Sequence, residues 1–142
     1  MVRAGHKTRT QLEAAICAEM ERQQLPHEHR TLHYRVRMKS GKVAKYEPAI
    51  IAHRGPILFL VEPFASAAAG AVERSLRFLD QHSPEIVYTV VAPKAVAAKL
   101  PLESYDELYD ADRIRECVLR IKGQDPLGPV RPFLKRRVTG SS

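Results

Sequence analysis

Two short runs of apolar, largely β-branched residues constrain the fold of this chain more than any other feature. They are ILFLV over residues 57–61 and IVYTVVA over residues 86–92. Continuous apolar runs of this length are typical of strands buried on both faces. A helix is predicted between them, over residues 67–82, with Ser66 as its N-cap. A strand–helix–strand unit has a right-handed crossover, so we predict an α/β fold with a parallel pair at its centre. The buried stripe predicted for the helix is Ala69, Val72, Leu76 and Leu79.

The remaining patterns predict helices and strands on both sides of this unit. Thr10 and Glu13 fit a capping box, and the acidic residues 103–112 are interpreted as caps of a following helix. In the resulting αβββαβ order, a mixed central sheet is flanked by helices within one domain, residues 1–124, and residues 125–142 form an irregular basic tail. The further predicted elements are a helix over 10–24, strands over 33–38 and 43–53, and helices over 94–99 and 112–122.

The positive charge of the chain is concentrated at one end. The net charge is +7, and residues 1–45 alone contain ten Lys or Arg against four Asp or Glu. Such a surface attracts a polyanion by releasing its counterions, although a solvated basic face that only aids solubility remains an alternative. Aromatic residues make up 6% of the chain, which favours contact with the DNA or RNA backbone over base stacking. The candidate nucleic-acid-binding residues are Arg35, Arg37, Lys39, Lys42, Arg136 and Arg137, with Lys45 beside them.

The composition excludes several other classes. No run of about 18 apolar residues is present, so no transmembrane helix and no membrane partner is expected. The basic N-terminal segment lacks the apolar region of a signal peptide, and we expect a cytoplasmic protein. Cys17 and Cys117 do not make a disulfide framework and are interpreted as fillers of the core. His27 and His29 are metal-ligand residue types, but no third ligand follows them closely in the sequence.

Three acidic residues lie on or at the ends of predicted elements in the first half of the chain. Glu13 lies on the first predicted helix, Glu47 and Pro48 on the second predicted strand, and Glu62 at the end of the third. With this element order, residues 10–92 resemble the restriction-endonuclease-like PD-(D/E)xK nuclease superfamily, which includes the archaeal Holliday-junction resolvases. The resemblance implies a restriction-endonuclease-like fold and hydrolysis of phosphodiester bonds with a divalent metal. By the same resemblance, the chain can be expected to form a homodimer, as nuclease-fold proteins of this size often do.

Carried over by position, the resemblance assigns roles to individual residues. Glu13 matches the helix acid, Pro48 the motif proline and Glu62 the acid of the third strand. Ala49 stands where the family has a metal-binding Asp, and Phe64 stands where it has a Lys.

A neighbouring pair offers replacements for the two missing groups. Residues two apart on a strand share a face, so Glu47 can replace the missing acid and Lys45 the missing cation. The candidate catalytic residues are then Lys45, Glu47, Glu62 and Glu13, with Mg²⁺ or Mn²⁺ held by Glu47 and Glu62.

Each acidic residue also has a structural interpretation. Glu13 can serve only the capping box, and Glu47 can pair with Lys45 on the surface. Glu62 ends an apolar strand and needs a partner there, either a basic residue such as Arg74 or a metal. Three hypotheses therefore remain at this point: a metal-dependent endonuclease, a catalytically inactive nuclease-fold subunit that binds nucleic acid or assembles with a partner, and an interaction module with no nucleic-acid role.

Overall fold

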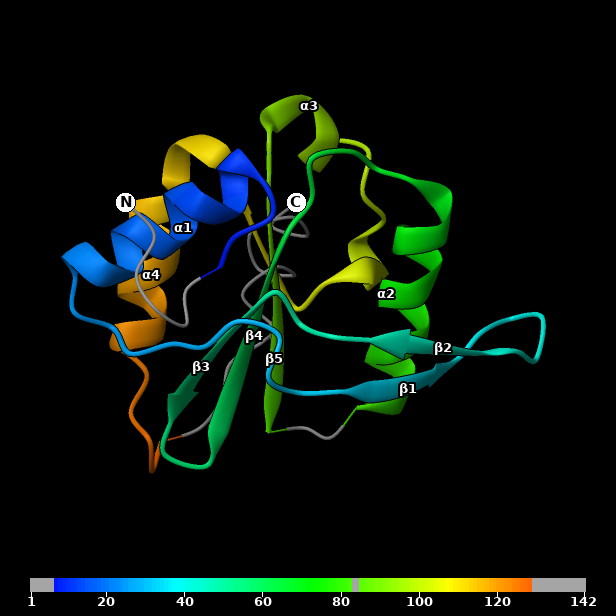
Figure 1. Ribbon diagram of the computed structural model, residues 1–142, viewed down its shortest axis with the longest axis horizontal. Coiled ribbons are helices and arrows are strands. Elements are labelled where there is room, and N and C mark those ends of the chain that lie inside the picture. The colour runs from blue at the N-terminus through cyan, green and yellow to red at the C-terminus, as the bar shows by residue number, and fades with distance from the viewer. Residues whose placement is uncertain (1–6, 83–84, 129–142) are drawn as a thin grey trace, which may run out of the picture.

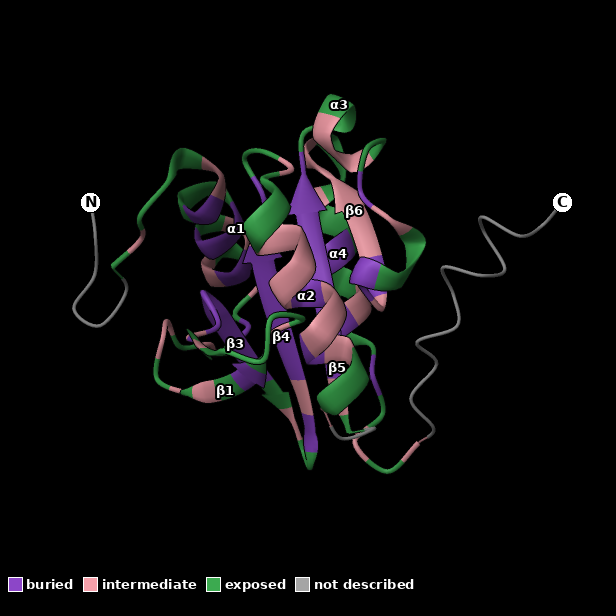
Figure 2. Ribbon diagram, turned by 90° about the vertical axis from the view of Figure 1, so that its right-hand side faces the viewer, coloured by how far each residue is buried: buried purple, intermediate pink, exposed green. Residues whose placement is uncertain are grey.

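The two apolar runs are adjacent central strands of a four-stranded sheet in the computed structural model, which describes residues 7–82 and 85–128 (Figure 1). β4 (Ile57–Pro63) and β5 (Ile86–Ala92) pair in parallel, and α2 (Ala69–Gln81) lies between them in the chain. Both strands are buried along most of their length (Figure 2). The predicted strand–helix–strand unit is therefore confirmed.

The two outer strands make the sheet mixed, as predicted. β3 (Ile50–Arg54) pairs antiparallel with β4, and β6 (Glu107–Asp110) pairs in parallel with β5, which gives the order β3-β4-β5-β6. β6 was not expected, because its acidic residues were interpreted only as helix caps. That interpretation is wrong for Glu107, which is buried, accepts a hydrogen bond from Arg120 Nε at 2.9 Å and forms an ion pair with Arg120 Nη2 at 2.8 Å. The ion pair lets an acidic residue occupy a buried strand position.

The strand predicted over residues 43–53 is two strands in two different sheets. β2 (Val43–Tyr46) pairs antiparallel with β1 (Tyr34–Arg37) in a separate hairpin, whereas β3 belongs to the main sheet. The chain changes sheets at residues 47–49, where Pro48 has no backbone N–H to continue a ladder. The alternating pattern of residues 33–38 is confirmed, with Val36 buried and Arg35 and Arg37 exposed.

Helices cover both faces of the sheet, and the β1–β2 hairpin shares one of these faces with α2 (Figure 1). α1 (Gln11–Arg22) and α4 (Ile114–Lys122) lie together on one face, where Ile16 and Met20 share a core cluster with Phe59 of β4. α2 and the β1–β2 hairpin lie on the other face, where their side chains share a second cluster with β5. The short elements are α3 (Lys94–Ala97) and the 3₁₀ turns η1 (Leu102–Ser104) and η2 (Ala111–Arg113).

The inner face of α2 differs from the predicted stripe. Ser75 and Phe78 are its buried residues, whereas Ala69 is exposed and the other stripe members are only partly buried. The N-cap is Ala68, with no side-chain cap, instead of Ser66. The helix faces both the sheet and the hairpin, so Phe78 enters an aromatic cluster that periodicity alone does not reveal. Within residues 7–82 and 85–128, none of the helices combines the length and apolar character that a membrane span requires.

Candidate functional site

Glu62 lies near the end of β4 with a side chain only 7% exposed. Its Oε2 accepts a hydrogen bond from the backbone N–H of Ala49 at 2.9 Å and another from the Tyr46 hydroxyl. Burial raises the pKa of the carboxyl, although these hydrogen bonds and the charges of Arg74 and Arg30 act in the opposite direction. A basic residue such as Arg74 or a metal was the expected partner of Glu62, but its hydrogen-bond partners are a tyrosine and a backbone amide, and Arg74 lies over the Tyr46 ring.

Glu13 is fully buried on α1 and bound to cationic and polar groups. Arg30 contacts both carboxylate oxygens, with Nη2 at 2.6 Å from Oε1 and Nη1 at 2.9 Å from Oε2. His29 Nδ1 lies 2.8 Å from Oε2, and the backbone N–H of Arg9 donates to Oε1. Burial acts to raise the pKa of Glu13, but these hydrogen bonds outweigh it and lower the pKa. The predicted cap is present too, since Thr10 Oγ1 accepts from the Glu13 backbone N–H at 3.1 Å.

Glu47 lies at the surface beside the end of β2. Its Oε2 is 2.7 Å from His33 Nδ1 and 3.4 Å from Lys45 Nζ. Lys45 itself is exposed, so the predicted contact between Lys45 and Glu47 is present as a surface ion pair.

Ala49 and Phe64 are both core residues. Ala49 is 4% exposed and Phe64 is 6% exposed, and each belongs to one of the two apolar clusters. The two positions at which the family carries charged catalytic groups are thus filled by apolar side chains that contribute to packing.

The three candidate acids, Glu13, Glu47 and Glu62, do not surround a common metal position. A hard divalent cation needs several oxygen ligands at about 2.0–2.6 Å from one centre. In the described part of the chain, Glu13, Glu47 and Glu62 do not form a group whose ligand atoms all lie within 4.8 Å of one another. Each carboxylate has protein partners of its own. These residues therefore do not fit an Mg²⁺ or Mn²⁺ site.

The β1–β2 hairpin carries an exposed row of cations, which we name the basic face. The register pairs Arg35 with Lys45 across the two strands, and Arg37 follows on the same side. The turn adds two lysines and is closed by Gly41, whose φ of +92° favours glycine. All members of the basic face are exposed, and they are Arg35, Arg37, Lys39, Lys42 and Lys45.

The opposite side of the hairpin is fixed to α2. The Tyr34 and Tyr46 rings lie 5.2 and 5.0 Å from the Phe78 ring. The Gln81 side chain bonds both the N–H and the C=O of Arg37, at 3.1 and 3.0 Å. The basic face is consequently held in place by packing and by hydrogen bonds to the edge of β1.

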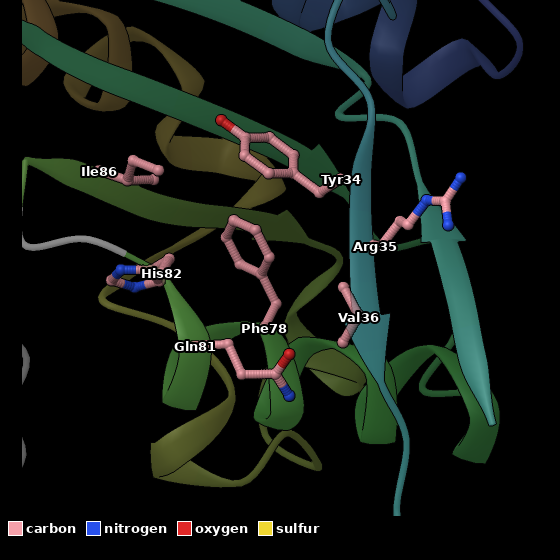
Figure 3. A pocket seen from close by; sticks show the side chains of 7 residues that line it. All are labelled: Tyr34, Arg35, Val36, Phe78, Gln81, His82 and Ile86. Carbon is pink, nitrogen blue, oxygen red and sulfur yellow. The ribbon is translucent and has the colours of Figure 1, made fainter. Parts of the chain in front are cut away.

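A pocket of about 250 Å³ lies between β1 and α2, beside the basic face (Figure 3). The Tyr34 and Phe78 rings lie together on its wall, whereas the Arg35 side chain points away from the other labelled residues. The pocket therefore shows no cation directed inward to bind a phosphate. Its lining consists of Tyr34, Arg35, Val36, Phe78, Gln81, His82 and Ile86.

A different group of potential ligands was missed by sequence reasoning. Cys17, His27 and His29 offer ligand atoms that all lie within 4.8 Å of one another, and they are the only such trio among residues 7–82 and 85–128. The sequence pattern indicated that both histidines lie in a loop, with no third ligand close to them in the chain. The third ligand comes from α1, ten positions before His27, and only the return of the chain after Pro26 brings it near.

The basic tail residues Arg136 and Arg137 lie outside the described residues. No protein-family model matches the sequence, and comparison with curated proteins and with solved structures gives no match either.

Proposed function

We propose that this chain is a non-catalytic nucleic-acid-binding protein with a restriction-endonuclease-like fold, and that its basic face binds the phosphate backbone of DNA or RNA. The observation that carries the proposal is the register of the hairpin, which places Arg35, Arg37 and Lys45 together on one exposed side. Residues two apart on a strand are separated by about 7 Å, so these side chains form a short, dense row of positive charge. Such a row binds phosphates and releases counterions.

The hairpin favours backbone contact over base readout. Tyr46 is fully buried, whereas Tyr34 is partly exposed and packs against Phe78. Base stacking needs aromatic rings that nucleobases can reach. The exposed side of the hairpin carries mainly flexible cations, with Tyr34 beside them, which suits contact with phosphates of any sequence.

The carboxylates support a binding role over a catalytic one. Glu13 is neutralised by Arg30, and the charge of Arg30 also acts on Glu62. The Arg30 guanidinium thus supplies at Glu13 the positive charge that a divalent metal supplies in an active nuclease. The endonuclease hypothesis stays a prediction, to be examined in the same experiment as binding.

The test compares two triple variants that lose the same charge. Fluorescence anisotropy of labelled single-stranded DNA, duplex DNA and duplex RNA is measured over a range of salt concentrations. Arg35→Gln/Arg37→Gln/Lys45→Gln should weaken binding at least tenfold. It should also make the salt dependence less steep by about 2–3 units of slope, because three phosphate contacts are lost.

The matched control removes three exposed cations elsewhere, on α3, just after it and on α4. Lys94→Gln/Lys99→Gln/Arg115→Gln should bind within about twofold of the wild type, because these cations lie outside the basic face. Both triple variants lose the same net charge, so a larger loss in the hairpin variant comes from the position of its cations. If both variants lose the same affinity, the basic face is not a binding site and its charge only aids solubility. DNA incubated with the protein and Mg²⁺ or Mn²⁺ should remain intact. Cleavage by the wild type that is absent with Glu62→Ala would establish the endonuclease instead.

A further inference from the structure

The segment after α1 brings two histidines to the same side of the chain. Gln24 has a φ of +58°, and the Leu25 backbone N–H donates to the Met20 carbonyl at 2.8 Å, so the chain reverses after the helix. Glu28 then forms a bridge with Ile51, the backbone N–H of each residue donating to the C=O of the other at 2.9 and 2.8 Å.

Side chains on the two sides of a bridged residue point to the same face of an extended chain. His27 and His29 therefore lie together, with ring centroids 5.2 Å apart. They face α1, where Cys17 Sγ lies 3.2 Å from His27 Nε2.

Hydrogen bonds orient both imidazole rings. His27 Nδ1 lies 2.9 Å from the Leu25 carbonyl, which can only accept, so Nδ1 carries the proton and Nε2 presents its lone pair toward Cys17. His29 Nδ1 lies 2.8 Å from the Glu13 carboxylate, which fixes the neutral ring in the same tautomer. A histidine bound to a carboxylate or carbonyl through its other nitrogen is the usual second-shell arrangement of metal-binding histidines.

We propose that Cys17, His27 and His29 bind one Zn²⁺ ion, with a water molecule or another small ligand as the fourth group. Zinc prefers cysteine sulfur at about 2.3 Å and histidine nitrogen at about 2.0 Å, which places sulfur and nitrogen about 3.5 Å apart in a tetrahedral site. The 3.2 Å contact of Cys17 with His27 is close to that value, and all three ligand atoms already lie within 4.8 Å of one another.

The ligand types exclude the hard metals. Mg²⁺ and Ca²⁺ require oxygen ligands, whereas one sulfur and two nitrogens suit zinc and similar borderline ions. Binding deprotonates the Cys17 thiol and releases its proton to solvent. The ion joins α1 to the loop after it, on the opposite face of the sheet from the basic face (Figure 1). Binding there can therefore be measured separately from nucleic-acid binding.

Cobalt is the spectroscopic probe for the test. Metal-free full-length protein is titrated with Co²⁺ and should develop a near-ultraviolet thiolate-to-cobalt charge-transfer band that saturates at one equivalent and disappears when Zn²⁺ is added. Cys17→Ser should lose the band, whereas Cys117→Ser, which removes the buried cysteine of α4, should retain it. Zn²⁺ should also raise the thermal unfolding temperature of the wild type and leave that of Cys17→Ser unchanged.

The histidines provide a second set of variants. His27→Gln and His29→Gln should each weaken Co²⁺ binding at least tenfold, and His53→Gln, which alters an exposed histidine on β3, should not. Far-ultraviolet circular dichroism checks that each variant is folded. A wild type without the charge-transfer band at saturating Co²⁺, or a band that persists in Cys17→Ser, would overturn the proposal. Neither result bears on the basic face, whose anisotropy assay uses no Co²⁺ or Zn²⁺.

Discussion

Arg30 binds Glu13 through two parallel contacts, Nη2 to Oε1 at 2.6 Å and Nη1 to Oε2 at 2.9 Å. The carboxylate is fully buried, and the guanidinium side chain is only 17% exposed. This pair joins α1 to the segment that precedes the hairpin, and the Arg30 backbone N–H also donates to the Pro48 carbonyl. An acid predicted to be catalytic is therefore bound by an arginine of the same chain.

Removal of Arg30 should be costly. Arg30→Ala leaves a buried carboxylate with only His29 and the Arg9 backbone as partners, and we expect the free energy of unfolding to fall by about 3 kcal/mol. Arg115→Ala, an exposed change on α4, should lower it by less than about 0.5 kcal/mol. Urea unfolding monitored by circular dichroism measures both. Equal stability of Arg30→Ala and the wild type would show that the pair makes no net contribution.

The contribution of Glu13 to the free energy of unfolding should be lost at acid pH. Its pKa is lowered in the folded state, so the folded protein binds fewer protons at this site than the unfolded chain does. The stabilisation is thus complete above the ordinary value of 4.5 and is lost as the pH falls through the lower folded pKa. Glu13→Gln should be less stable than the wild type near neutral pH, and the difference should shrink below 4.5. A difference that stays constant with pH would contradict this account.

Glu62 should show the opposite pH dependence. Burial raises its folded pKa, so ionisation costs stability as the pH rises from about 4.5 through the folded value. Glu62→Gln keeps an oxygen that accepts from Tyr46 and Ala49, and should be at least as stable as the wild type near neutral pH. Glu62→Ala removes that acceptor and should cost about 2–4 kcal/mol, because two buried donors lose their partner. Thermal and urea unfolding compare the three proteins, and a less stable Glu62→Gln would contradict the direction of the shift.

Glu47 should oppose nucleic-acid binding. It forms an ion pair with Lys45 and contacts His33 beside the basic face, and its charge repels phosphates. Glu47→Gln should therefore tighten binding of duplex DNA by about threefold at low salt, an effect that shrinks as salt screens the charge. Glu116→Gln, an exposed acid on α4, removes the same charge elsewhere and serves as the control. If the two variants bind equally, the gain comes from net charge and not from the hairpin.

Much of the fold follows from local patterns. The runs ILFLV and IVYTVVA are strands because only a buried sheet accommodates such continuous apolar, β-branched segments. Thr10 caps α1 because its side chain satisfies a backbone N–H that the helix leaves open. The outward cations of residues 33–38 follow from the two-residue period of a strand.

Other features depend on partners that are distant in the sequence. Glu107 can occupy a buried position on β6 because Arg120 of α4 pairs with it. No local sequence pattern indicates that pairing. The break between β2 and β3 falls at Pro48, and Glu62, about fifteen positions later, binds Tyr46 and Ala49 on the two sides of it. The predicted homodimer and the roles of the tail residues stay predictions.

The candidate site divides in the same way. Local patterns are enough to show that the hairpin cations share one face, and that Glu62 ends a buried strand and needs a partner. The identity of the partners follows only from the packing of distant segments: Arg30 lies on Glu13, Tyr46 and Ala49 on Glu62, and the two histidines near Cys17. The physical reason is that strand and helix periods fix the direction of a side chain within its own element, whereas the groups it meets depend on how the elements pack and on where the loops reverse the chain.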